Sequence, residues 1–136
     1  MDKFFVDTNI FLRYLTNDDP GKADRVERIL RKAIDGQLRL MTNIMVVAEL
    51  VWTLESYYGL SKQDISEKLS LLINTPNLDL PEKQRILKAL VLYVEQNMDF
   101  IDAYNAHFAK DQGISAILTY DKKHFDRLDW MQRREP

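Results

Sequence analysis

The stretch FFVDTNIFLRYL, residues 4–15, decides how the chain is expected to fold. The residues after Lys3 are aromatic or β-branched, and together with Lys3 they predict a short buried strand over 3–6. From Ile10 onward the apolar spacing changes and predicts a short helix. A carboxylate between such elements is costly unless something pairs with it, so Asp7 is the first candidate functional residue. The apolar side chains of the stretch are expected in the core: Phe4, Phe5, Val6, Ile10, Phe11 and Leu12.

The composition is that of an ordinary globular protein. The chain has 136 residues, of which 46% are apolar and 29% charged, with no cysteine and a net charge of -2. This length fits one domain, 1–136, with 129–136 as a candidate flexible tail. No apolar run approaches the length of a membrane span, and the missing cysteines exclude disulfides and thiolate metal sites. We therefore expect a cytoplasmic protein without a membrane partner.

Helical and extended patterns alternate along the chain. Amphipathic spacing and capping residues predict helices over 22–36, 44–59, 61–73, 81–96 and 99–113, with a last helical turn at 122–128. Further strands are expected over 37–41, 78–80 and 115–121. This alternation predicts an α/β fold with a mainly parallel sheet, in which ligands collect at the carboxyl ends of strands. Asp7 and Asp121 both stand at such strand ends.

Four acidic residues lie in apolar surroundings or at a strand end: Asp7, Glu49, Asp102 and Asp121. Carboxylates that are brought together repel one another, and burial without a counter-charge favours their protonated forms. A hard divalent cation such as Mg²⁺ or Mn²⁺ removes both difficulties because it prefers oxygen ligands and can bridge to phosphate. Such ions would let a net-acidic protein cleave a nucleic acid through an activated water.

Each of these acids also has an ordinary structural explanation. Asp7 could be a helix N-cap, Glu49 a solvated helix residue and Asp121 a turn residue. Asp102 could face water, although aspartate is a mediocre residue within a helix. Asp99 is better explained as an N-cap than as a ligand, but it shares a helix face with Asp102. No single residue is specific, whereas the joint pattern is.

Taken in order, four motifs in this chain resemble those of the PIN-domain family, most closely its small VapC-like toxins of type II toxin–antitoxin pairs. The opening motif is VDTNIFLRYL and the second is VVAELVW. The third is DFIDAYNAHFA and the closing one is AILTYDKKHFDRL. The resemblance covers the chain from Lys3 to about Leu128. One motif alone would be weak, but four in order make the assignment specific.

The resemblance implies a three-layer α/β/α fold with a five-stranded, mainly parallel sheet and helices on both faces. It implies a ribonuclease that depends on Mg²⁺ or Mn²⁺, with Asp7, Glu49, Asp102 and Asp121 as catalytic acids and metal ligands. Asp7 and Asp102 would be the firmest ligands. His124 or Asp126 is the alternative that could share or replace the role of Asp121. The supporting residues, which would orient carboxylates, water or phosphate, are Thr8, Asn9, Asp99 and Thr119.

Basic residues offer candidate contacts to RNA. The cluster beside Asp121 is the better candidate, and it comprises Lys122, Lys123, His124 and Arg127. Arg25, Arg28 and Lys32 form a basic helix face, for which solvation is the ordinary explanation and contact with RNA or an acidic partner segment the alternative. The resemblance further implies a small antitoxin partner and a homodimer. Two other functions stay open, a non-catalytic PIN-like binding module and a housekeeping RNA-processing nuclease without an antitoxin.

Overall fold

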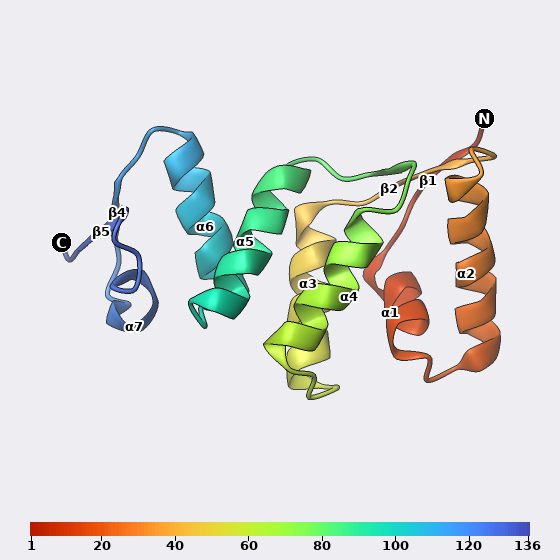
Figure 1. Ribbon diagram of the computed structural model, residues 1–136, viewed down its shortest axis with the longest axis horizontal. Helices are drawn as coiled ribbons and strands as arrows, with labels where there is room; N and C mark the ends of the chain where they lie inside the picture. Colours follow the sequence, from red (N-terminus) through yellow and green to blue (C-terminus); the bar gives the residue numbers. More distant parts are fainter. The chain divides into compact units, whose positions relative to one another are not determined.

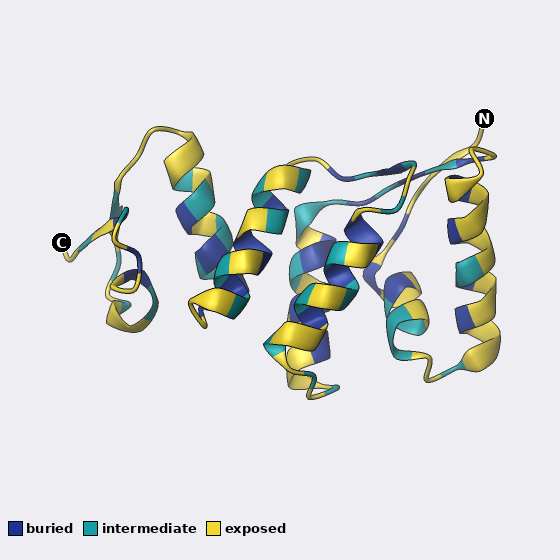
Figure 2. Ribbon diagram, in the orientation of Figure 1, coloured by how far each residue is buried: buried dark blue, intermediate teal, exposed yellow.

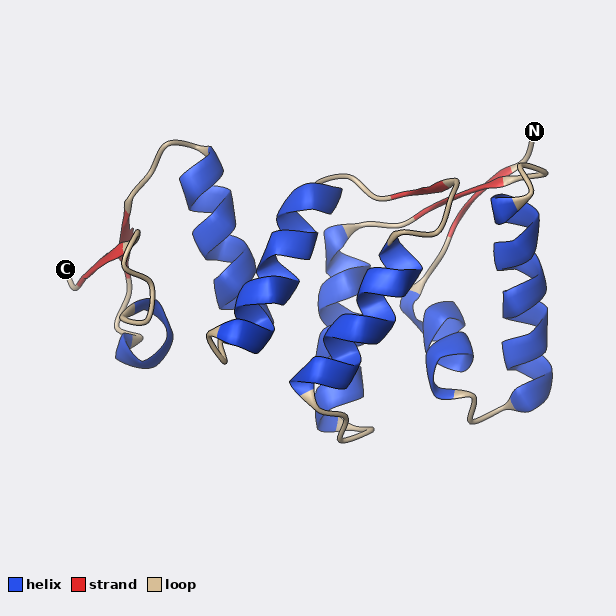
Figure 3. Cartoon of the chain, in the orientation of Figure 1, coloured by secondary structure: helices blue, strands red, loops and turns tan.

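Strand β1, Lys3–Phe5, opens the computed structural model, which describes residues 1–136. It pairs in parallel with β2, Arg39–Met41, which pairs in parallel with β3, Leu78–Asp79. This three-stranded sheet belongs to the first of two compact units, residues 1–83, called unit 1. Because β1 and β3 are its outer strands, each has a hydrogen-bonded neighbour on one side only. Figure 3 shows the three strands in red.

Unit 1 also contains four helices, and each follows a capping residue whose side chain accepts a hydrogen bond from a backbone N–H of the first turn. They are α1, Thr8–Thr16; α2, Pro20–Ile34; α3, Ile44–Ser56; and α4, Lys62–Ile73. Asn43 caps α3 by accepting from Val46 N at 3.1 Å, and Ser61 caps α4 by accepting from Asp64 N at 3.1 Å. Local side-chain chemistry therefore fixes where these helices start (Figure 1).

The interior of unit 1 is formed mainly by the inner faces of the helices, which are dark in Figure 2. Phe11, Leu54, Ile65 and Leu69 are at most 1% exposed. The expectation that the whole opening stretch is core is wrong for three of its members: Phe4 is 48% exposed, Phe5 58% and Ile10 43%. Successive side chains of a strand point to opposite faces of the sheet, so both faces of β1 are exposed at Phe4 and Phe5, whereas Val6 and Phe11 are buried as expected.

The second compact unit, residues 84–136, is called unit 2. It contains nearly all of α5, Lys83–Glu95, followed by α6, Phe100–Asp111, β4, Ala116–Leu118, α7, Lys122–Phe125, and β5, Gln132–Arg134. The ring of Tyr93 meets that of Phe100 edge-on at 6.3 Å, and Arg85 pairs with Asp111 at 2.9 Å. These two contacts join α5 to α6. Strands β4 and β5 pair in parallel.

The α/β class and the parallel pairing are confirmed, with seven helices and five short strands. The strands pair as a group of three and a group of two, so the single five-stranded sheet stays a prediction. Helix α5 begins at Lys83, two residues after the predicted Pro81. Strand β5 was not predicted and lies in the stretch that the sequence suggested as a flexible tail. No helix has the length and hydropathy that crossing a membrane requires.

Candidate metal centre

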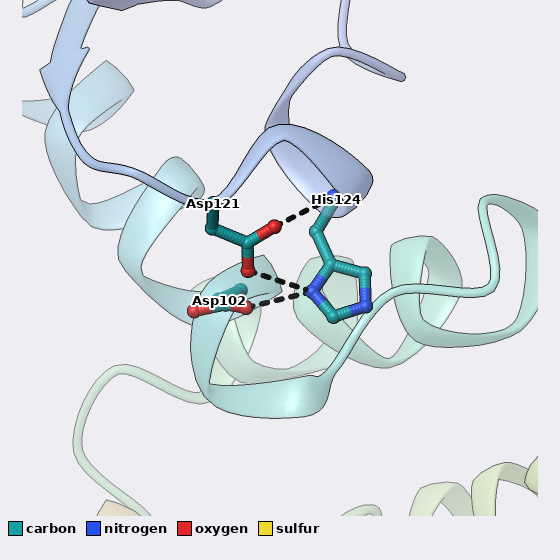
Figure 4. Close-up of side chains that lie close together, drawn as sticks. All are labelled: Asp102, Asp121 and His124. Atoms are coloured by element: carbon teal, nitrogen blue, oxygen red, sulfur yellow. Dashed lines mark hydrogen bonds and ion pairs between the residues drawn. The ribbon is translucent and has the colours of Figure 1, made fainter. Parts of the chain in front are cut away.

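Three side chains of unit 2 converge on one point. His124 Nδ1 lies 2.9 Å from Asp102 Oδ2 and 3.1 Å from Asp121 Oδ2 (Figure 4). All three are partly buried, with side-chain exposures of 19% for His124, 25% for Asp102 and 33% for Asp121. Because both neighbours of Nδ1 are carboxylates, the ring donates its hydrogen to them. The imidazole therefore holds together two acids that are far apart in the sequence.

Local structure places each member of this cluster. Asp102 lies in the first turn of α6, where Asp99 is the N-cap and accepts from Ile101 N at 3.1 Å. Asp121 follows β4 and is the N-cap of α7, accepting from His124 N at 3.1 Å. The hydroxyl of Thr119 accepts from Asp121 N at 3.0 Å, which fixes the turn between strand and helix. The same capping interaction that starts α7 thus also brings His124 over Asp121.

The two carboxylates have opposite pKa shifts. Partial burial, and then the charges of Asp99 and Asp121, raise the pKa of Asp102 above its ordinary value, against the hydrogen bond from His124. The backbone N–H of His124 lowers the pKa of Asp121. Asp121 is therefore the firmly ionised member, and Asp102 is the member that most needs a compensating positive charge. Paired carboxylates with divergent pKa values are typical of functional sites.

Asp7 is placed differently from what its apolar neighbours suggested. It is exposed, and its carboxylate accepts from Thr8 N at 2.8 Å as the N-cap of α1. The premise that burial forces a cation on Asp7 is therefore wrong in unit 1, because water and the cap already solvate the charge. The neighbouring Thr8 is 7% exposed, and its hydroxyl is buried without a hydrogen-bond partner. An orphaned hydroxyl beside a carboxylate fits a bound water or an ion's hydration shell.

Glu49 is exposed on α3, between the buried residues Val46, Val47 and Leu50 of the same helix. The start of α3 is tied to the end of β1 by Thr42, whose buried hydroxyl donates to Val6 O at 3.0 Å. This contact fixes the end of β1 before Asp7. A threonine directly after a strand could equally cap the helix that follows, so the sequence alone does not indicate this role.

The remaining predicted residues fall into three groups. Asp126 pairs with Arg133 at 2.8 Å and does not belong to the cluster of Asp102, Asp121 and His124. Arg127 donates to the carbonyls of Gln96 and Asn97 at 2.8 and 2.5 Å, which makes it a structural contact within unit 2. Three residues are exposed and available: Asn9, Lys122 and Lys123.

The donor set of the cluster suits a divalent cation. One ligand atom from each of Asp102, Asp121 and His124 lies within 4.8 Å of the others. Two carboxylates and an imidazole are ligands that Mn²⁺ accepts, and the carboxylates alone suit Mg²⁺. A cation here would also compensate for the partial burial that chiefly raises the pKa of Asp102, and for the charges of Asp99 and Asp121 that add to this shift. The structure thus brings together Asp102, Asp121 and His124, while Asp7 and Glu49 belong to unit 1.

Comparison with protein families identifies residues 4–131 as a PIN domain. The chain belongs to the PIN-domain family. Among curated proteins, it is 25% identical over 118 residues to a VapC ribonuclease of Aquifex aeolicus, with 87% of each chain covered. The match extends over nearly the whole chain, as the motif resemblance predicted.

Two solved structures also resemble the chain. One is Mycobacterium tuberculosis VapC20, described as a sarcin–ricin loop cleaving toxin, at 18% identity and a TM-score of 0.41, covering 89% of this chain and 92% of that one. The other is VapBC2 of Rickettsia felis bound to a promoter DNA fragment, at 14% identity and a TM-score of 0.40, covering 98% of both chains.

Proposed function

We propose that this PIN-domain protein is an endoribonuclease that hydrolyses RNA phosphodiesters with Mg²⁺ or Mn²⁺, and that it is the toxin of a type II toxin–antitoxin pair. The cluster of Asp102, Asp121 and His124 is the observation that carries the proposal. Two partly buried carboxylates that share one imidazole, one of them with a raised pKa, are typical of functional sites. The curated relative named VapC ribonuclease supports the same activity.

From the four motifs we infer that the catalytic acids are Asp7, Glu49, Asp102 and Asp121. Asp7 and Asp121 each follow a strand of a parallel pair, and ligands of parallel sheets collect at these ends. We also infer that the five strands form one sheet. Its support is that β1 and β4 are each paired on one side only, and that Phe5 and Leu118 on them are 58% and 71% exposed. Outer strands with exposed apolar side chains favour further pairing.

The residues of the proposed site have different roles in binding the cations and orienting the substrate. Asp102 and Asp121, with Asp7 and Glu49, would hold the cations, and His124 keeps the first two carboxylates in a common orientation. The cap from His124 N keeps Asp121 ionised, ready to accept a positive charge. The buried hydroxyl of Thr8 and the exposed amide of Asn9 would orient water or phosphate beside Asp7. When bound, the cations supply an activated water and neutralise charge on the phosphodiester.

The partners proposed from the family are a small antitoxin and a second copy of this chain, in the cytoplasm. Exposed apolar side chains on α3 offer surface for such contacts, since Trp52 is 71% exposed and Met45 68%. A neighbouring reading frame for a small antitoxin would separate a toxin from a housekeeping nuclease. Loss of growth on expression, rescued by co-expression of that frame, would support the toxin.

Cleavage of single-stranded RNA tests the proposed activity directly. We expect wild-type protein to cleave with Mg²⁺ or Mn²⁺ and to stop in EDTA, and Asp102→Asn and Asp7→Asn to lose at least about 100-fold in kcat. Asp64→Asn, which removes an exposed carboxylate from the first turn of α4, is the matched control and should cleave normally. Circular dichroism checks that each variant is folded. An Asp102→Asn protein that cleaves at the wild-type rate would refute the proposal.

A further inference from the structure

A groove between α1 and α2 has a charge unlike that of the rest of the chain. Its volume is about 430 Å³, and it is lined by Asn9, Ile10, Arg13, Lys22, Arg25, Val26 and Ile29. Three of these seven residues are cationic and none is acidic, whereas the whole chain has a net charge of -2. A concave surface lined by one sign of charge concentrates the field that a polyanion would meet.

The cations of this groove are available for a ligand. Lys22 and Arg25 are exposed on α2, and neither side chain forms an ion pair within the chain. Arg13 on α1 shares its guanidinium with Asp18 at 3.3 Å in a pair that is about 40% exposed on both sides. Exposed pairs of this kind contribute little energy, so a phosphate can compete for Arg13. Between the cations, the side chains of Ile10, Val26 and Ile29 form an apolar lining.

The position of the groove distinguishes it from an ordinary solvated helix face. Asn9 lines it and lies in the first turn of α1, two residues after Asp7. The groove therefore reaches the first turn of α1, the helix that Asp7 caps. Arg28 and Lys32 are equally exposed cations of α2, but they do not line the groove. A general solubility role would apply to all four basic residues, whereas this location singles out Lys22 and Arg25.

We propose that the α1–α2 groove binds the backbone of a single-stranded RNA as it leaves Asp7, with Arg13, Lys22 and Arg25 contacting phosphates. This inference rests on the proposed function, because it assumes that the cleaved phosphodiester lies at Asp7. An acidic peptide could also bind such a groove. RNA is favoured because a chain cut at Asp7 must continue along the protein surface, and the groove offers cations beginning at Asn9, two residues after Asp7. The apolar lining suits the faces of unstacked bases.

The test compares two double variants of α2 with the same change in charge. Lys22→Gln with Arg25→Gln removes two groove cations, and Arg28→Gln with Lys32→Gln removes two cations outside it. A fluorescein-labelled oligouridylate is titrated in EDTA, so that binding is measured without cleavage. We expect the groove variant to bind about tenfold more weakly, with a dependence of log K on log salt that is shallower by roughly 1.4, while the control variant binds as wild type. In Mg²⁺, the groove variant should raise KM about tenfold with kcat within about twofold.

Failure of this inference is distinguishable from failure of the proposed nuclease. If wild type cleaves but both double variants bind and cleave alike, the groove does not hold RNA. If polyglutamate competes with the RNA probe at lower concentration than unlabelled oligouridylate, the groove serves an acidic protein segment and the inference is overturned. If the wild type does not cleave but the groove variant still loses RNA affinity selectively, the binding inference survives and the catalytic proposal fails.

Discussion

In unit 1 the carboxylate of Asp7 is exposed and caps the helix that follows it, whereas in unit 2 Asp102 is partly buried and shares a histidine with Asp121. In unit 2 the pKa of Asp102 is raised, chiefly by burial, while the pKa of Asp121 is lowered by the backbone N–H of His124. The contacts of Asp7 alone are those of an ordinary helix cap. The opposite pKa shifts of Asp102 and Asp121, by contrast, are typical of a functional site.

Among the variants that test this comparison, we expect the largest loss of Mn²⁺ affinity and RNA cleavage from changes to His124, which has no counterpart beside Asp7. We expect His124→Ala to lower Mn²⁺ affinity and RNA cleavage by about 10- to 100-fold, because Asp102 and Asp121 lose their common donor. His124→Asn places an amide N–H near the position of Nδ1 and should restore most of the loss. Calorimetric titration with Mn²⁺ and cleavage assays measure both. An alanine variant that matches wild type in both assays would show that the bridge has no functional role.

The pH dependence of stability separates the two carboxylates of unit 2. A raised pKa means that folded Asp102 holds its proton more tightly than the unfolded chain does, so its ionised form lowers stability as pH rises through that pKa. In metal-free buffer, Asp102→Asn should therefore melt a few degrees above wild type at neutral pH. This advantage should vanish as pH falls through the pKa of Asp102.

Asp121 should behave in the opposite way. Its lowered pKa contributes stability that is present above the ordinary value of 3.8 and is lost as pH falls through the folded pKa. Asp121→Asn should therefore melt below wild type at neutral pH, and the gap should close in acid. Thermal melts over a pH series measure both variants. Equal shifts in the same direction would contradict the opposite environments assigned to these acids.

The smallest effect is expected on the free energy of unfolding when Asp7 is changed, because its exposed carboxylate only caps α1. Asp7→Ala should lower the free energy of unfolding by about 0.5–1 kcal/mol because Thr8 N loses its acceptor. Asp7→Asn keeps an acceptor oxygen and should change stability by only a few tenths of a kcal/mol. Urea denaturation without metal distinguishes them. A large loss of stability in Asp7→Asn would contradict this capping role, because the amide oxygen of asparagine can still accept from Thr8 N.

Much of the fold could be predicted because its signals are local. Asn43, Ser61 and Asp99 cap helices as their spacing indicated, and most helix boundaries agree within a few residues. Strand β5 was missed because its residues, Gln132–Arg134, have neither β-branched side chains nor apolar alternation. Its pairing with β4 is a tertiary effect that no local pattern encodes.

The candidate site was only partly predictable for the same reason. The acids could be named, and Asp121 could be placed at a strand end, because strand ends and motifs are local. The contact of His124 with Asp102, 22 residues earlier, depends on how α7 packs and gives no sequence signal beyond its place in the closing motif. The exposure of Phe4 and Phe5 was mispredicted because strand hydrophobicity does not tell whether the faces of a strand are covered.

The central claim is that the cluster of Asp102, Asp121 and His124 holds a divalent cation, and Mn²⁺ affinity in a double-mutant cycle tests it most directly. The variants are Asp102→Asn, Asp121→Asn and their combination, with Asp64→Asn as the control for lost charge. If both carboxylates hold the ion, each single change weakens binding by about tenfold or more, and the double variant loses much less than the sum, with a coupling above about 0.5 kcal/mol. An Asp102→Asn protein that binds Mn²⁺ as tightly as wild type would contradict the account.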